Sequence, residues 1–268
     1  MASSFLRIVV AVAVISFVLI IGTLATNMKD KTRYRLLVIQ GLTFAQFVNF
    51  FFARYTWTYL YATTWNYASK THGGRLRKLL MTPLAFVLIM AQFSIISGYI
   101  LSNVEPHWFV VLSFSCFGIM MIMVTLVFVA QILDSILALA DLNRRGNRSF
   151  PTVVKCLCIL ILTAILTISA LVNAAQPPVV KNYQIPVLHL PKCFQDLTIL
   201  QLSDMHIGPT VGKSQVEFIV ELSNKLKPDV VLFSGDLLDA PLQIKQAIQP
   251  LSKLLSKYGV FFVAGTVQ

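Results

Sequence analysis

The sequence predicts a multi-pass α-helical membrane protein that continues into the beginning of a soluble α/β domain. Of its 268 residues, 56% are hydrophobic and only 12% are charged, and the mean hydropathy is +0.74. Soluble globular domains do not have this composition. Several apolar runs reach the roughly 18 to 20 residues that a helix needs to cross a bilayer. After residue 176 the apolar runs become short and alternate with helical patterns, which is typical of an α/β domain.

Five apolar segments are predicted to span the membrane, so the lipid bilayer is the expected partner of the first 176 residues. The first segment is also compatible with a cleaved signal peptide whose basic region contains Arg7, but its apolar run exceeds the usual length of about 7 to 15 residues. A membrane-spanning helix is therefore favoured. The five segments are 5–26, 36–60, 79–101, 108–133 and 153–175.

The second of these segments carries the polar residues Gln40, Gln46 and Asn49. Such groups could line a transport path, but hydrogen bonds between helices satisfy them equally well. A transporter would also need charged residues deep inside the spans, and the sequence suggests only Arg7 and Arg54, both near segment ends. Helix packing is the favoured interpretation.

The net charge of +11 comes from membrane topology and does not indicate nucleic-acid binding. Up to Val180 there are 14 Lys and Arg residues against 4 Asp and Glu, whereas from Lys181 onward there are 8 against 7. Basic loops tend to stay on the cytoplasmic side. With five spans, this rule favours a cytoplasmic N-terminus and a lumenal or extracellular C-terminal domain. Glycosylation of the single sequon, Asn147-Arg148-Ser149, would reverse that orientation.

A proline-containing linker, 177–192, is predicted to connect the membrane block, 1–176, to a second domain, 193–268. Short apolar strands are expected at 197–202, 229–233 and 259–264. A helix is expected at 215–226, opened by a capping box of Ser214 and Glu217, and a second, interrupted at Pro250, at 242–257. The order is therefore β-α-β-α-β, which indicates a parallel sheet with right-handed crossovers.

Acidic residues and a histidine follow the first two strands. Asp204 and His206 come after the first strand in Asp204-Met205-His206-Ile207-Gly208, and Gly235-Asp236-Leu237-Leu238-Asp239 follows the second. Ligands of parallel sheets gather at the carboxyl ends of the strands. Carboxylates and an imidazole brought together there suit a divalent cation such as Zn, Mn or Fe. Either motif alone is more often a turn or a helix cap, and it is their ordered pairing that predicts a metal site.

These two motifs, Asp-x-His-x-Gly and Gly-Asp-x-x-Asp, resemble the first two blocks of the calcineurin-like metallophosphoesterase superfamily. The resemblance implies that Asp204 and His206 bind one metal and that Asp236 bridges two metals which bind a phosphate ester. It further implies that Asp239 is a supporting residue that orients the site, alongside Gly208 and Gly235. The expected function is that of a membrane-anchored, metal-dependent phosphoester hydrolase.

The chain departs from the family pattern after the third strand. The family has Gly-Asn-His-Glu/Asp there, whereas this sequence reads Gly265-Thr266-Val267-Gln268. The expectation is therefore a truncated form that binds at most one metal and is inactive or nearly so. It is also expected to have a loosely held half-sheet, which protection from hydrogen exchange across 197–264 would contradict. The alternative is a non-catalytic membrane protein, or a truncated isoform, that acts through its helices.

Overall fold

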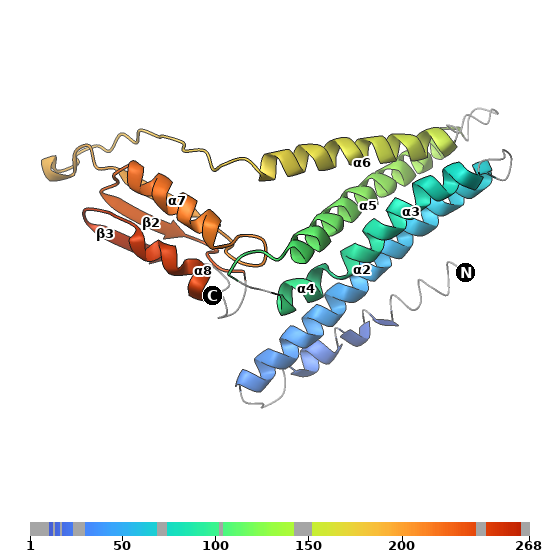
Figure 1. The fold of residues 1–268 in the computed structure, drawn as a ribbon, viewed down its shortest axis with the longest axis horizontal. Helices are drawn as coiled ribbons and strands as arrows, with labels where there is room; N and C mark the ends of the chain where they lie inside the picture. The colour runs from blue at the N-terminus through green and yellow to red at the C-terminus, as the bar shows by residue number, and fades with distance from the viewer. Residues whose placement is uncertain are drawn as a thin grey trace. The chain divides into compact units, whose positions relative to one another are not determined.

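The computed structural model describes residues 11–12, 14–16, 18–23, 30–68, 74–101, 104–141, 152–239 and 245–263. The chain forms two compact units (Figure 1). The first comprises 1–95 and 113–172, and the second comprises 96–112 and 173–268. The predicted fold class is confirmed, because long apolar helices precede a small parallel sheet.

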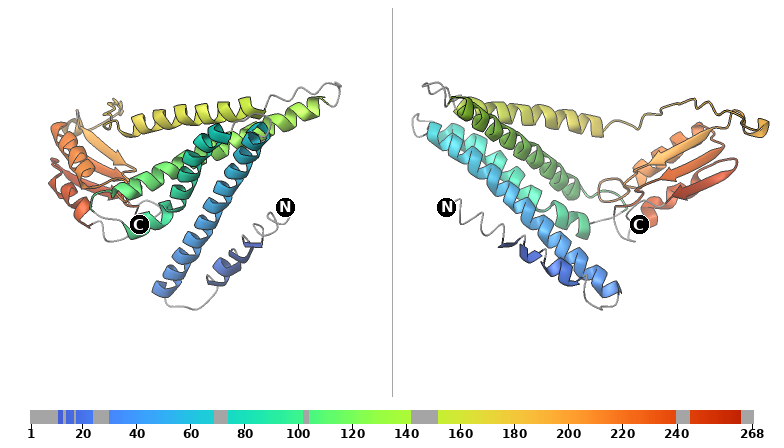
Figure 2. Two further views of the ribbon diagram at one scale, coloured as in Figure 1. Left: turned by 45° about the vertical axis from the view of Figure 1, so that its right-hand side comes forward. Right: turned by 180° about the vertical axis from the view of Figure 1, so that it is seen from behind.

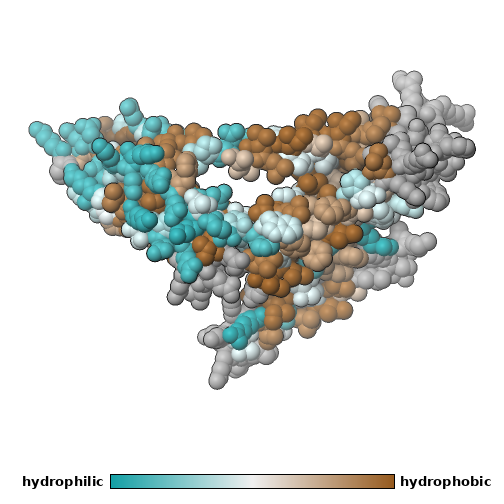
Figure 3. Space-filling view, viewed as in Figure 1, coloured by the Kyte–Doolittle hydropathy of each residue, from teal (hydrophilic) through white to brown (hydrophobic). Residues whose placement is uncertain are grey.

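The first unit is built from long helices: α2 (Asp30–Ala68), α3 (Gly74–Gln92), the start of α4 (Ser94–Ile100), most of α5 (Trp108–Asp141) and α6 (Thr152–Ala174). Three contain spans long and apolar enough to cross a membrane, at Arg35–Ala62, Trp108–Leu137 and Val154–Ala174. The apolar helical stretches Val14–Thr23 and Met81–Gln92 are shorter. Large apolar side chains remain exposed along these helices (Figure 3), as expected of a surface that faces lipid. The protein is therefore a membrane protein.

The predicted segment 79–101 is interrupted at Phe93, where α3 ends and α4 begins one residue later. The Ala91 carbonyl accepts hydrogen bonds from the Asn49 amide and from the Ser94 hydroxyl, both at 2.9 Å. Side chains thus satisfy a backbone group at the break, as a membrane interior requires. The Gln46 amide also donates to Gln92 at 3.2 Å. These bonds support the interpretation that the polar residues of the second segment hold helices together.

Two charged residues in the candidate spans were not predicted from the sequence. Asp134 of α5 and Lys155 of α6 form an ion pair, and both lie inside candidate spans, near the ends. A nearby hydrogen bond of 2.7 Å joins the Tyr55 hydroxyl of α2 to the Gln131 side chain of α5. An ion pair between neighbouring helices is the usual way to satisfy such charges in a membrane. The expectation that only Arg7 and Arg54 carry charge there was wrong.

The second unit contains the parallel sheet in the predicted β-α-β-α-β order (Figure 2). The strands β1 (Ile199–Ser203), β2 (Val230–Ser234) and β3 (Gly259–Val263) pair in the order β1-β2-β3. Helix α7 (Lys213–Lys225) connects the first two strands, and α8 (Lys245–Ile248) and the 3-10 helix η3 (Gln249–Lys253) precede the third. A further 3-10 turn, η1 (Lys192–Phe194), follows the exposed linker.

One face of the sheet carries the core of this unit. Val231 and Phe233 of β2 are buried against Val216 and Val220 of α7 and against Ala247, Leu254 and Ile207. The other face is open: Ile199 and Phe261 are each 53% exposed and Val263 is 64% exposed. Parallel sheets are normally covered on both faces. Among the described residues, the helices therefore pack against β1 and β2 on one face of the sheet.

The predicted capping box does not form. The N-cap of α7 is Gly212, which makes no side-chain cap hydrogen bond, and Ser214 lies inside the helix. The Ser214 hydroxyl and amide instead bond to a distant carboxylate, that of Glu105. Glu217 pairs with Lys213 at 3.8 Å, one turn apart. The capping-box prediction was wrong because Ser214 bonds to Glu105, a residue distant in the sequence, and does not cap the helix itself.

Candidate metal centre

The two motifs lie where β1 and β2 end, and backbone hydrogen bonds join them. The register pairs Ser203 with Ser234, the last residues of the two strands. Pairing continues past the strands, because Ile207 and Leu238 form a parallel bridge. The His206 amide donates to the Asp236 carbonyl at 3.2 Å, and the Ile207 amide donates to the Leu237 carbonyl at 2.9 Å. The two loops are thus held as one piece.

The three predicted ligands come together. Ligand atoms of Asp204, His206 and Asp236 all lie within 4.8 Å of one another. Asp204 and His206 are exposed and Asp236 is partly buried, so the group opens to solvent. Ligands about 2.1 Å from one ion lie about 3 to 4 Å apart, so small side-chain rotations would bring all three groups onto one cation. The residues present fit a divalent metal.

The backbone at this site adopts conformations that side chains usually avoid. Asp204 and His206 have φ angles of 51° and 47°, and Gly235 has a φ of 83°. Aspartate and histidine tolerate this left-handed region better than most residues. Gly235 is needed for its conformation, since a Cβ there would lie in ordinary contact, 3.6 Å from Asp204 Oδ1. Such backbone strain concentrates at functional sites.

Asp239, predicted to support the site, contacts His206 directly. Its Oδ1 lies 2.6 Å from His206 Nδ1. An Nδ1–H bonded to a carboxylate leaves Nε2 with its lone pair free to bind a metal, which is a common second contact of histidine ligands. The Asp239 amide donates to the Ile207 carbonyl at 3.1 Å, which fixes the aspartate backbone. Gly208 allows the approach, because a Cβ there would lie 3.0 Å from that of Asp239.

The carboxylates around His206 raise its pKa above the usual value. The main cause is the hydrogen bond to Asp239, followed by the negative charge of Asp239, with smaller contributions from Asp236 and Asp204. The protonated form of the imidazole is therefore more stable in the metal-free protein than in a free histidine. Because the pKa is higher in the folded chain, the pair stabilises the fold below the ordinary pKa and loses that effect as the pH rises through the raised value.

We predict that replacing Asp239 with asparagine lowers the pKa of His206 in the metal-free protein toward its ordinary value, because the bonded carboxylate is removed. NMR titration of ¹³C-labelled histidines in the intact chain, with EDTA present, would measure this. The His206 resonance can be assigned from a His206→Gln variant. An unchanged titration curve in Asp239→Asn would mean that the two side chains do not interact in solution.

The sequence predicted which three side chains come together, but not all of the contacts that position them. The positive φ values at Asp204 and His206 and the bridge between Ile207 and Leu238 have no signature in residue type. The contact of Glu105 with α7 was also missed, because it joins residues 109 positions apart. The only local indication of the site in the sequence was the small and acidic residues that follow each of the first two strands.

Comparison with known proteins identifies relatives of the chain. A zebrafish (Danio rerio) protein named transmembrane protein with metallophosphoesterase domain is 37% identical over 181 residues, 66% of this chain. A bovine (Bos taurus) protein of the same name is 33% identical over 190 residues, 68% of this chain. An uncharacterized metallophosphoesterase of Helicobacter pylori is 39% identical over 79 residues, 29% of this chain and 21% of that protein.

The chain corresponds to only part of these relatives, since the matched regions span 41% of the zebrafish protein and 42% of the bovine protein. No family model matches the chain, and no solved structure is significantly similar to it. The matches with the two vertebrate proteins nevertheless cover about two thirds of the chain, more than its α/β part alone. The resemblance seen in the two motifs is confirmed: the chain is a homologue of the metallophosphoesterases.

Proposed function

We propose that this chain provides the membrane anchor and the first metal-binding loops of a metal-dependent phosphoesterase. The observation that carries the proposal is the convergence of Asp204, His206 and Asp236, whose ligand atoms lie within 4.8 Å of one another. The homology to metallophosphoesterases supports the same reading. Asp204 and Asp236 contribute carboxylate oxygens and His206 contributes Nε2.

Manganese, zinc or iron suits this donor set, because carboxylates and imidazole together favour borderline divalent cations. When bound, such a cation neutralises charge on the ester oxygens and makes water more acidic. Asp239 holds the imidazole through Nδ1, which would leave Nε2 to bind the cation. Gly208 and Gly235 allow the close approach and the backbone turn that this arrangement needs. The substrate class is a phosphoric ester that reaches the solvent-open side of the three ligands.

The test uses the whole chain, purified in detergent, with Mn²⁺ or Zn²⁺ and p-nitrophenyl phosphate. We expect one metal ion per chain, because the described residues offer one such ligand group. We also expect bound metal to draw inorganic phosphate to the site, measured as metal-dependent phosphate binding that Asp236→Asn abolishes. A chain that takes up neither metal ion would overturn the proposal.

A second candidate is a non-catalytic membrane protein that acts through its helices. It is favoured by the ligand group that the described residues offer, since three side chains can hold one metal ion and a two-metal hydrolysis needs more ligands. Slow turnover of p-nitrophenyl phosphate that disappears in Asp236→Asn would exclude this candidate. Metal uptake without turnover would support it for the chain by itself.

The division into a membrane block of 1–176, a linker of 177–192 and an α/β domain of 193–268 is part of this proposal. The proposed lumenal or extracellular placement of the α/β domain is supported by the basic residues at 70–78 and 144–148. By the positive-inside rule, these residues face the cytoplasm. The sequon at Asn147 lies outside the described residues. Endoglycosidase treatment of protein made in cells tests the placement, because a mobility shift that Asn147→Gln abolishes would reverse it.

A further inference from the structure

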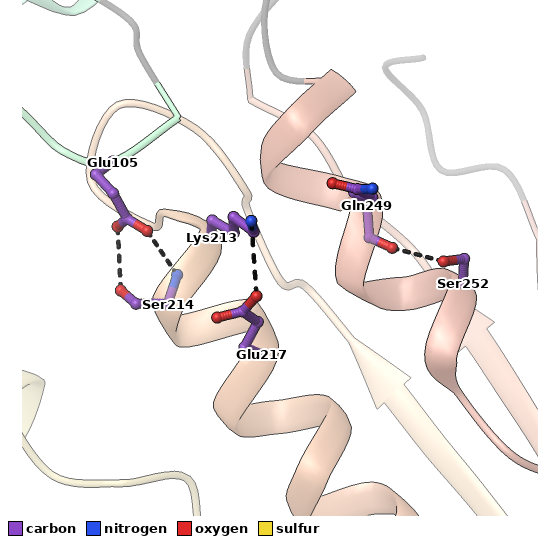
Figure 4. Close-up of polar contacts among 6 residues, drawn as sticks. All are labelled: Glu105, Lys213, Ser214, Glu217, Gln249 and Ser252. Atoms are coloured by element: carbon purple, nitrogen blue, oxygen red, sulfur yellow. Dashed lines mark hydrogen bonds and ion pairs between the residues drawn. The ribbon is translucent and has the colours of Figure 1, made fainter.

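A loop from an earlier part of the chain lies on the first turn of α7 (Figure 4). The loop, Val104–His107, and the helix belong to the same compact unit. The Lys213 amide donates to the Val104 carbonyl at 3.0 Å. The Glu105 carboxylate accepts two hydrogen bonds from Ser214, one from the amide at 2.8 Å and one from the hydroxyl at 3.0 Å.

These bonds satisfy groups that the helix itself leaves without partners. The first amides of a helix have no intrahelical acceptor, and the N-cap, Gly212, has no side chain to supply one. The Val104 carbonyl and the Glu105 carboxylate take that role for the first two amides. A negative charge is also favoured at a helix N-terminus, because the peptide dipoles leave partial positive charge there. Glu105 therefore replaces the local cap that the sequence led us to expect.

The contact leaves no room for a side chain at Gly212. A Cβ at this position would lie 2.4 Å from Glu105 Oε2 and 2.5 Å from Pro106 Cδ, closer than atoms can approach. The φ of Gly212 is −100°, which any residue can adopt. The glycine is thus required for space and not for backbone conformation.

We propose that the loop Val104–His107 is the docking point of the α/β domain, and that Glu105 is the cap that fastens the domain to it. The loop and the domain must then lie on the same side of the membrane. The candidate spans Trp108–Leu137 and Val154–Ala174 agree with this independently, because two crossings return the chain to the side from which it started. Docking also anchors the segment that runs from His206 to α7.

The experiment uses the full chain with EDTA present, so its result is independent of metal binding and hence of the proposed function. A Val104→Cys, Lys213→Cys pair replaces two residues whose backbones are bonded at 3.0 Å and leaves Glu105, Gly212 and Ser214 in place. Under mild oxidation we expect a disulfide, identified by mass spectrometry of the linked peptides. The matched control pairs Val104→Cys with Ser252→Cys, which lies on η3 and bonds only to its own helix through the Gln249 carbonyl, at 2.8 Å (Figure 4).

Adding Glu105→Ala to the cysteine pair should slow cross-linking about tenfold, which corresponds to the loss of a charge-assisted hydrogen bond. Adding Gly212→Ala should slow it by a similar factor, because its Cβ would collide with Glu105 and Pro106 and displace the loop. Glu105→Gln keeps an acceptor of the same shape and should give an intermediate rate. Hydrogen exchange of the unaltered chain provides a second test, with slow exchange expected at Lys213 and Ser214. Cross-linking no faster than in the control pair, a rate unchanged by Glu105→Ala, or free exchange at these amides would overturn the proposal.

Discussion

Replacing Asp236 with asparagine is expected to lower the affinity of the intact chain for Mn²⁺ or Zn²⁺ by more than about 100-fold. Changing a group that only supports a ligand costs about 10- to 100-fold, and Asp236 is proposed to be a ligand itself. Its carboxylate has a ligand atom within 4.8 Å of those of Asp204 and His206. Isothermal titration calorimetry of the purified chain in detergent, near neutral pH, would measure the change.

The matched control is Asp229→Asn. Asp229 precedes β2 and Asp236 follows it, so the two variants remove the same charge from opposite ends of one strand. The Asp229 carboxylate accepts a hydrogen bond from the Thr198 amide at 2.9 Å, which an asparagine oxygen can still accept. We expect metal affinity to stay within about twofold, as is usual for surface changes away from a site. Equal losses in both variants would show that the effect is one of folding or net charge.

Replacing Phe233 with alanine is expected to destabilise the α/β domain by about 3 to 5 kcal/mol, the usual cost of removing a buried phenylalanine. Phe233 is 5% exposed and lies in the core formed by β2, α7 and η3. In a core covered from one side only, this loss should remove most hydrogen-exchange protection from β1 and β2. Exchange measured by mass spectrometry on the full chain would report it.

Phe261→Ala gives the comparison for this prediction. Phe261 lies on the neighbouring strand, aligned with Leu232 and on the open face of the sheet, and it is 53% exposed. Removing its side chain leaves no buried cavity, so hydrogen exchange in β1 and β2 should change little. If both variants lose protection equally, the open face is covered in solution and the core is larger than the sheet and its helices indicate.

The elements that the sequence predicts well are those whose pattern is local. Apolar length predicted α5 and α6 to within a few residues at their starts, and strand-length apolar runs followed by acidic residues predicted β1 and β2. The alternation of strands and helices then placed Asp204, His206 and Asp236 at one edge of a sheet, which the structure confirms. Topology rules suffice there, because parallel neighbours end at the same edge.

The features that could not be predicted depend on contacts between distant residues. At the break at Phe93, the Ala91 carbonyl accepts a hydrogen bond from Asn49, which lies on another helix. The failed capping box follows from Glu105, which outcompetes a local partner for Ser214. The ion pair between Asp134 and Lys155 was missed because each residue, read alone, sits at the end of an apolar run. Propensity and periodicity carry no information about such partners.

The backbone bridge between Ile207 and Leu238 places the ligand set across the seam of two paired segments, with Asp204 and His206 on one side and Asp236 on the other. Occupancy and folding are then thermodynamically linked: a cation at 100 times its dissociation constant would add about 2.7 kcal/mol to the stability of the domain. That is a large share of the unfolding free energy of a typical domain, and this sheet is covered on one face. The folded fraction of this domain would then rise with the supply of metal in its compartment.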